Sequence, residues 1–273
     1  MRRVSYLFLC AIPVIVGLLT GIRALRVPVL HDVLGMLLFG LIVSSIWWLA
    51  RPACDSRDDL ASVVRASGIL LLLPTALIAL FWVGLATPWE ATASENKMRY
   101  AVLLAGSISA TVGLVLLKEA LTVSGERLFS TLAFAASLLS GAAYVGWTSF
   151  QLGDFALRLG SGSLSPAVAS MNNVFDGLLF AASALAYAAT AAFASALARV
   201  GWLGRNGSRA YVALSLVALV LLMLRGVSFP IPGGDPEPWY TRPGFIVGIP
   251  AAPWLMPYFL GVLLIRRASV NGA

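Results

Sequence analysis

Long apolar stretches recur along the whole chain and are separated by shorter polar segments. An apolar helix needs about 20 residues to cross the hydrocarbon core of a bilayer, and eight stretches reach that length. The predicted spans are 4–22, 29–50, 66–87, 100–121, 128–150, 167–198, 210–229 and 244–265. This pattern predicts an all-α fold, a polytopic integral membrane bundle of eight transmembrane helices that fills residues 1–273 as a single transmembrane domain.

The composition agrees with lipid as the main solvent of this chain. Hydrophobic residues make up 59% of it and charged residues 11%, with a mean hydropathy of +0.89. Soluble domains carry about 25% charged residues, which they need to cover their surface. The composition therefore excludes an ordinary soluble enzyme and a disordered chain.

Several kinds of chemistry are excluded by the scarcity of the residues that they require. The chain has a single histidine, His31, so it supplies neither a bis-histidine haem site nor a zinc site with two histidines. The two cysteines, Cys10 and Cys54, form no C-x-x-C motif. Of the two lysines, Lys97 lies in a predicted loop and Lys118 near a predicted helix end, which disfavours a retinal Schiff base. We expect no cofactor and no metal.

The basic residues are distributed unequally between the two sides of the predicted bundle. The side that holds both termini carries 12 of the 19 lysines and arginines and 5 of the 12 acidic residues. Its basic residues are Arg2, Arg3, Arg51, Arg57, Arg65, Lys118, Arg127, Arg199, Arg205, Arg209, Arg266 and Arg267. Because cytoplasmic loops carry the excess of basic residues, both termini are expected in the cytoplasm, with the chain in the cell (inner) membrane. Anionic lipid, and not nucleic acid, is the partner that this charge predicts.

The loops on the opposite side are longer and carry aromatic residues. They are predicted at 88–99, 151–166 and 230–243, and Trp89, Trp239 and Tyr240 lie in them. Two interpretations remain open. The aromatic residues form the belt usual at a membrane interface, or loops 88–99 and 230–243 form a surface for a protein partner.

The two halves of the chain show weak similarity, which is the pattern of an internal duplication. Val33 and Leu37 match Val174 and Leu178 at one constant offset. A 4+4 parallel repeat would have the halves 1–123 and 124–273, and such repeats occur in transporters. Apolar helices also match by chance, so this alternative stays open.

Asp176 is the clearest charged residue inside a predicted span. It lies about 13 Å into the span 167–198, at 1.5 Å per residue. Asn172 and Asn173 precede it by one helical turn and share its face. Arg225, near the outer end of the next span, is the expected ion partner, because a charge at the bilayer centre costs about 2.5–3.5 kcal/mol.

His31 and Asp32 open the second span on the same side of the membrane. We therefore predict a polar cluster in the outer leaflet that binds a ligand or carries a proton. Its predicted members are His31, Asp32, Asn172, Asn173, Asp176 and Arg225. The alternative is structural: an interhelical ion pair, with the asparagines as packing or capping residues.

The eighth predicted span is rich in residues that interrupt a helix. Pro250 and Pro253 follow Gly248 within it, and proline removes a backbone donor and bends a helix. A broken transmembrane helix is a sequence indicator of a transport site, so we include Pro250 and Pro253 among the ligand-binding residues. The alternative is a kinked helix that serves packing alone.

Three functions are compatible with these observations. The first is the binding or translocation of a small or lipophilic solute through the outer-leaflet polar cluster. The second is a non-catalytic subunit of a membrane complex. The third is a lipid-modifying intramembrane enzyme, for which only His31, Asp32 and Asp176 are available as acid–base groups, without a nucleophile.

Overall fold

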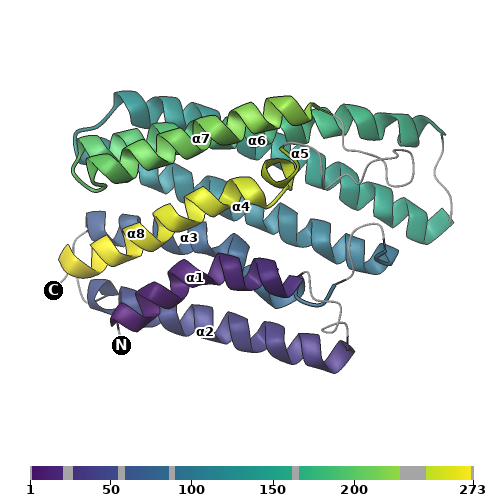
Figure 1. Cartoon of the computed structure of the whole chain (residues 1–273), viewed down its shortest axis with the longest axis horizontal. Helices are drawn as coiled ribbons and strands as arrows, with labels where there is room; N and C mark the ends of the chain where they lie inside the picture. Colours follow the sequence, from purple (N-terminus) through teal and green to yellow (C-terminus); the bar gives the residue numbers. More distant parts are fainter. Residues whose placement is uncertain are drawn as a thin grey trace. The chain divides into compact units, whose positions relative to one another are not determined.

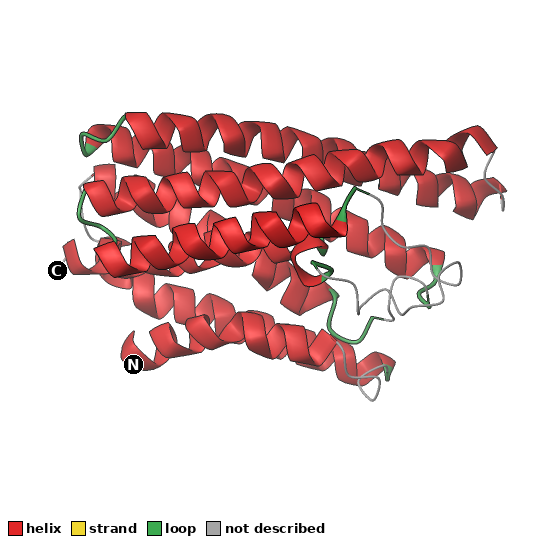
Figure 2. Ribbon diagram, turned by 45° about the horizontal axis from the view of Figure 1, so that its top comes forward, coloured by secondary structure: helices red, strands yellow, loops and turns green. Residues whose placement is uncertain are grey.

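The computed structural model describes residues 2–20, 27–54, 59–85, 90–161, 166–227 and 244–271. Within these residues all regular structure is helical (Figure 2). The helices in chain order are α1 (Arg2–Thr20), α2 (Pro28–Cys54), α3 (Asp59–Phe81), α4 (Ala93–Val123), α5 (Leu128–Ser161), α6 (Pro166–Arg199), α7 (Arg205–Arg225) and α8 (Leu255–Asn271), with the short 3-10 helices η3 (Ile246–Gly248) and η4 (Ala252–Trp254) before α8 (Figure 1). Helices α1 to α7 are long and apolar enough to cross a membrane. The predicted all-α polytopic membrane bundle is therefore confirmed.

The eighth predicted span, 244–265, differs from the observed element. Residues 244–254 form turns and the two 3-10 helices, and α8 has 17 residues, or about 26 Å. Pro250 and Pro253 lie in the interrupted part. Because each proline lacks a backbone N–H, a regular α-helix starts only after them.

The outer loops predicted at 88–99 and 151–166 are partly helical, which corrects the sequence interpretation. Helix α4 begins at Ala93 because Thr92 and Glu95 form a capping box. The Thr92 amide donates to Glu95 Oε2 at 2.7 Å, and the Glu95 amide donates to Thr92 Oγ1 at 3.2 Å. Helix α5 continues to Ser161, along α6, and the rings of Phe150 and Phe175 stack 3.8 Å apart.

The chain divides into two compact units. Unit 1 comprises Met1–Ala120 and Pro257–Ala273, and unit 2 comprises Leu121–Met256. Unit 1 thus holds α1 to α4 and most of α8, whereas unit 2 holds α5 to α7, η3 and η4. The duplication into 1–123 and 124–273 remains a prediction, since compactness does not test internal homology.

In unit 1, α8 runs antiparallel to α1 and ends beside its start. The Tyr258 hydroxyl donates to Leu9 O at 2.7 Å, and the Arg266 guanidinium carbon lies 4.7 Å from the ring centre of Tyr6. Both chain ends therefore lie at the same end of unit 1 (Figure 1).

In unit 2, α5 and α6 pack along each other through small residues. Ala182, Ala189 and Ala196 of α6 are fully buried, and the Ser140 hydroxyl of α5 donates to Ala182 O at 2.7 Å. Small side chains allow helix backbones to approach closely, and van der Waals contact then holds the helices together in lipid.

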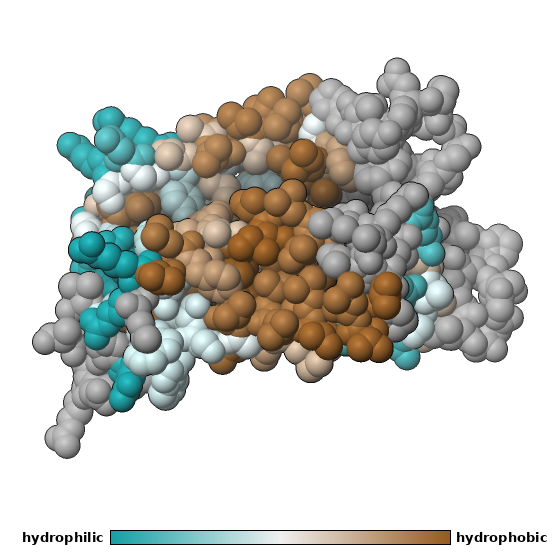
Figure 3. All heavy atoms as spheres, turned by 60° about the horizontal axis from the view of Figure 1, so that its bottom comes forward, coloured by the Kyte–Doolittle hydropathy of each residue, from teal (hydrophilic) through white to brown (hydrophobic). Residues whose placement is uncertain are grey.

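Side chains on the outside of the helices are apolar, as expected for contact with lipid. In α2 and α7, for example, Val29 and Leu224 are 73% and 66% exposed. Figure 3 shows such residues as a hydrophobic band, with hydrophilic residues at the end that carries the chain termini. In a soluble protein an exposed surface of this kind would be an aggregation hazard, whereas in a bilayer it is solvated.

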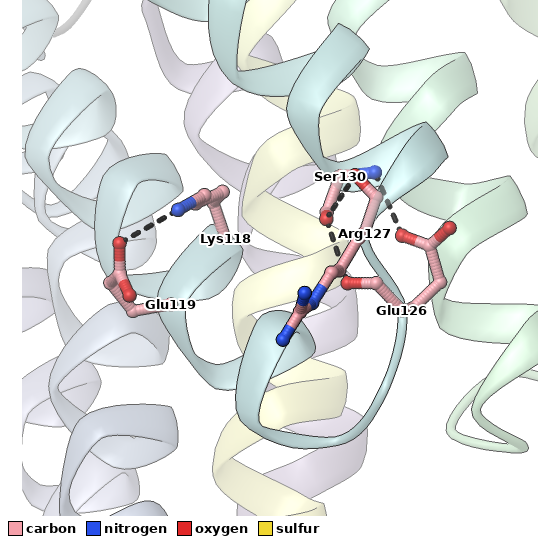
Figure 4. Close-up of polar contacts among 5 residues, drawn as sticks. All are labelled: Lys118, Glu119, Glu126, Arg127 and Ser130. Atoms are coloured by element: carbon pink, nitrogen blue, oxygen red, sulfur yellow. Dashed lines mark hydrogen bonds and ion pairs between the residues drawn. The ribbon is translucent and has the colours of Figure 1, made fainter.

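The start of α5 is stabilised by a buried carboxylate. Glu126 is 5% exposed, and its two carboxylate oxygens accept from the backbone amides of Phe129 and Ser130 at 3.0 and 2.8 Å (Figure 4). These amides belong to the first turn of the helix, where they have no intrahelical acceptor. Glu126 therefore acts as the N-terminal cap of α5.

We expect Glu126→Ala to lower the free energy of unfolding by about 0.5–2 kcal/mol, because it removes this cap. The measurement is the thermal unfolding midpoint of the purified protein in one detergent. Glu119→Ala is the matched control, since Glu119 is exposed and pairs with Lys118 at 2.9 Å (Figure 4). An equal loss in both variants would contradict the capping role.

Close contact between α3 and α8 in unit 1 yields a second prediction. A Cβ built at Gly261 would lie 2.8 Å from Gly68 O and 2.9 Å from Leu71 Cβ. Gly261→Leu should therefore destabilise the protein by about 1–3 kcal/mol through overpacking. The control is Gly40→Leu, because a Cβ at Gly40 meets no atom within 4 Å. Equal unfolding midpoints of the two variants would show that α8 does not pack closely on α3.

Candidate functional site

Arg225, the last residue of α7, is the centre of a polar site in unit 2. Its guanidinium donates to Gly226 O at 3.3 Å, to Gly248 O at 3.0 Å and to Val227 O at 3.5 Å. Asp176 of α6 attracts it electrostatically. The ion pair between Asp176 and Arg225 stays a prediction, and the acceptors that the structure adds are backbone carbonyls.

The acceptor Gly248 belongs to the interrupted segment 244–254, which lies against α6 and α7. Helix η3 contacts α7, and η4 contacts α6. Where the α-helix is interrupted, carbonyl groups lose their regular i+4 donors. In lipid such groups are tolerated only where protein or enclosed water satisfies them.

Two buried tyrosines supply donors to this segment. Tyr187 of α6, 3% exposed, donates to Val247 O at 2.9 Å. Tyr144 of α5, 2% exposed, donates to Pro250 O at 3.2 Å and also lies 3.2 Å from Ser183 Oγ. Together with Arg225, the two tyrosines donate to three carbonyl groups of the segment. We call these three donor side chains, Tyr144, Tyr187 and Arg225, the carbonyl clamp.

Glycine is required at two positions around the clamp. Gly244 has a φ of +77°, and a Cβ built there would overlap the carbonyl of Leu221. A Cβ built at Gly248 would overlap the guanidinium of Arg225. The missing side chain at Gly248 therefore provides the space in which Arg225 reaches the segment.

Pro250 and Pro253, the two prolines predicted to bind a ligand, have different surroundings. Pro253 is buried at the start of η4, and the carbonyl of Pro250 accepts from Tyr144. The adjacent Trp254 is 5% exposed, and its ring centre lies 5.6 Å from that of Tyr144 at an interplanar angle of 51°. Tyr144 thus contacts the segment through both its hydroxyl and its ring.

The other predicted site residues are only partly placed. Asn172 and Asn173 lie in α6, one turn before Asp176, but their side chains fall outside the described residues. His31 and Asp32 lie in α2 of unit 1, and His31 Nε2 is 3.1 Å from Asp32 Oδ1. Their convergence with Asp176 and Arg225, which belong to unit 2, remains a prediction.

Sequence reasoning missed both tyrosines of the clamp. A tyrosine near the middle of an apolar span carries a hydroxyl that needs a partner, and Tyr144 and Tyr187 are both of this kind. That signal would have found them. Their acceptors were beyond prediction, because they are backbone carbonyls far away in the sequence.

Other buried polar residues come from segments that were interpreted as loops. Asp154 in α5 is 3% exposed and follows Trp147 and Gln151 on one buried helical face. In unit 1, Arg99 of α4 is 8% exposed, donates to Asn96 and lies over the ring of Trp82 at 5.6 Å. The helical spacing of these residues was the available signal.

The comparisons with known proteins yield no relative. The chain matches no protein-family model, and no curated protein or solved structure is significantly similar to it. The class of protein is therefore defined by the fold alone, as a multi-pass helical membrane protein.

The carbonyl clamp is tested by removal of one hydroxyl. Tyr187→Phe leaves the buried carbonyl of Val247 without its donor, which should cost about 1–3 kcal/mol of unfolding free energy. Ser195→Ala, the control, removes a hydroxyl of α6 that donates only within its own helix, to Ala191 O at 2.9 Å. Thermal unfolding in detergent compares the two. If Tyr187→Phe were as stable as Ser195→Ala, the hydroxyl would not hold the segment.

Proposed function

We propose that this multi-pass membrane protein binds or translocates a small or lipophilic solute at the carbonyl clamp, with segment 244–254 as a movable closure. The observation that carries this proposal is the non-helical backbone of 244–254, hydrogen-bonded by side chains from three transmembrane helices. Discontinuous helices of this kind form the substrate sites of many transporters.

The clamp favours a solute that presents hydrogen-bond acceptors. All three clamp side chains donate to the segment, and their acceptors are the carbonyls of Val247, Gly248 and Pro250. A carbonyl, carboxylate or phosphate oxygen of a solute would replace a segment carbonyl at the same donor. Such an exchange keeps the donor paired, so it avoids the cost of a buried unpaired donor, and the released segment carbonyl would then turn to water.

Asp176 would determine how strongly the site binds a charged solute. It attracts Arg225 from α6, so the pair has no net charge when both groups are ionised. An anionic solute would compete with Asp176 for the guanidinium, whereas a neutral one would leave the pair in place. The intramembrane position of both residues supports a functional role.

The orientation that we propose has both termini in the cytoplasm of a cell (inner) membrane. It is supported by the excess of lysine and arginine on the side of the termini. Segment 244–254 then faces the outer leaflet, and it would admit the solute from outside.

The second candidate function is that of a non-catalytic subunit in a membrane complex. It is favoured by the fact that the segment carbonyls already have donors within the chain, which is the arrangement of a permanent structural lock. A permanent structural lock requires no path for water into the protein. The solute-binding function therefore predicts that 244–254 becomes accessible to water, and the subunit function predicts that it does not.

Thiol labelling distinguishes these two functions. Ala251→Cys, placed in a Cys10→Ser/Cys54→Ser background, puts a thiol in the segment. We expect it to react with the membrane-impermeant anion methanethiosulfonate ethylsulfonate, added outside intact cells. Tyr187→Phe should raise the reaction rate about fivefold, because one hydrogen bond that holds the segment closed is lost.

Ala189→Cys is the matched control, since Ala189 of α6 is fully buried, and it should stay unreactive in both backgrounds. Labelling after denaturation verifies that both thiols are present. An Ala251→Cys thiol as unreactive as Ala189→Cys, with or without Tyr187→Phe, would exclude a movable closure and favour the subunit function.

A further inference from the structure

Arginines from three helices gather at the end of unit 1 that carries the chain termini. Helix α1 begins with Arg2 and Arg3, and the last turns of α8 carry Arg266 and Arg267. These two helix ends are adjacent, because the Arg266 guanidinium carbon lies 4.7 Å from the ring centre of Tyr6. They therefore place four guanidinium groups in one region.

Helix α3 brings a fifth arginine to the same end. A Cβ built at Gly68 of α3 would lie 2.9 Å from Gly261 O and 3.2 Å from Ile265 N of α8. Leu71 and Gly261 are likewise in contact, so the two helices run antiparallel. Arg65 lies one turn before Gly68, and this turn faces the end of α8 with Arg266 and Arg267.

Arg65 has a donor that no protein group of the described chain satisfies. Its Nη1 atom is buried and has no hydrogen-bond partner among the described residues. A buried unpaired donor costs about 1–3 kcal/mol, and more for a charged group. An acceptor bound from outside the chain would remove this cost.

Few described acidic residues balance these arginines. Lys118 and Glu119 of α4 pair with each other at 2.9 Å, and Asp59 at the start of α3 is exposed. Among the described residues, the end of unit 1 therefore has an excess of positive charge. We call Arg2, Arg3, Arg65, Arg266 and Arg267 the arginine cluster.

The surface next to the arginine cluster suits acyl chains. Val4 and Leu7 of α1 are 69% and 66% exposed, within two turns of Arg2 and Arg3. In Figure 3 the hydrophilic residues of this end border the hydrophobic band. A ligand with an anionic head and apolar tails matches both parts of this surface.

We infer that the arginine cluster binds the headgroup phosphate of an anionic phospholipid. Guanidinium groups bind phosphate oxygens in a bidentate manner, and basic sites between transmembrane helices bind anionic headgroups. Arg65 gives the site its specificity, since its buried Nη1 requires an acceptor that enters the protein beside α3. The inference is independent of the function proposed for the carbonyl clamp.

The experiment measures lipid binding to the purified full-length protein in a neutral detergent. Dioleoyl-phosphatidylglycerol is titrated, and the concentration that gives half of the maximal thermal stabilisation is recorded. Dioleoyl-phosphatidylcholine and inorganic phosphate are titrated in parallel. We expect stabilisation by phosphatidylglycerol alone.

Variants then locate the site. Each arginine removed from the cluster should weaken phosphatidylglycerol binding about fivefold, so Arg266→Gln/Arg267→Gln should weaken it about 25-fold. Arg65→Gln tests the buried donor. Arg205→Gln/Arg209→Gln is the matched control, because both residues are exposed in α7 of unit 2 and the same charge is removed. This control should bind as the wild type does.

Three results would overturn the inference. Equal weakening in the control pair would mean that binding follows net charge and not the arginine cluster. Equal stabilisation by phosphatidylcholine would remove the role of the headgroup charge, and stabilisation by inorganic phosphate at the same concentration would remove the role of the lipid. If Arg65→Gln fails to fold, Arg266→Gln alone still decides the result, because Arg266 is exposed. A fivefold loss of phosphatidylglycerol affinity would support the inference, and an unchanged affinity would overturn it.

Discussion

Every backbone carbonyl that enters the hydrocarbon region must find a donor within the protein, and this constraint governs the interrupted segment 244–254. The apolar helices satisfy it by their own periodicity. Pro250 and Pro253 make the same solution impossible over 244–254, because they remove donors that a continuous helix would need. Once the regular helix is lost, Tyr144, Tyr187 and Arg225 donate from α5, α6 and α7 to other carbonyls of the segment. The carbonyl clamp therefore serves, in the first place, to pair the carbonyl groups of a broken helix.

The same constraint explains why a structural and a functional interpretation of the carbonyl clamp require the same residues. A hydrogen bond between a side chain and a backbone carbonyl is stable in lipid as long as no other acceptor is present, and it exchanges when one arrives. Gly248 provides the space for Arg225, and Asp176 supplies the opposite charge. A permanent lock and a releasable closure thus require the same residues. They differ in the free energy of the open state, which depends on three hydrogen bonds and the packing of Trp254 against Tyr144.

Charge has a separate role in unit 1. Basic residues that flank transmembrane helices help to set the topology during insertion, and they keep their place at the helix ends in the folded protein. In unit 1 the contacts of α8 with α1 and α3 bring several of them together. A residue pattern that serves topology in the unfolded chain then becomes a potential lipid site in the folded one. The glycines at the α3–α8 contact are essential here, since bulkier residues would separate Arg65 from the end of α8.

The sequence by itself determined the all-α membrane class and the positions of seven spans, because hydrophobic length alone specifies a helix in lipid. It also predicts an ion pair between Asp176 and Arg225, since an intramembrane charge favours an opposite one nearby. Only the tertiary structure decided that Tyr144 and Tyr187 bind segment 244–254, and that Asp154 and Arg99 are buried. Each of these depends on contacts between residues distant along the chain. Local periodicity reports how strongly a side chain prefers lipid or water, but it carries no information about which backbone group a buried donor will meet.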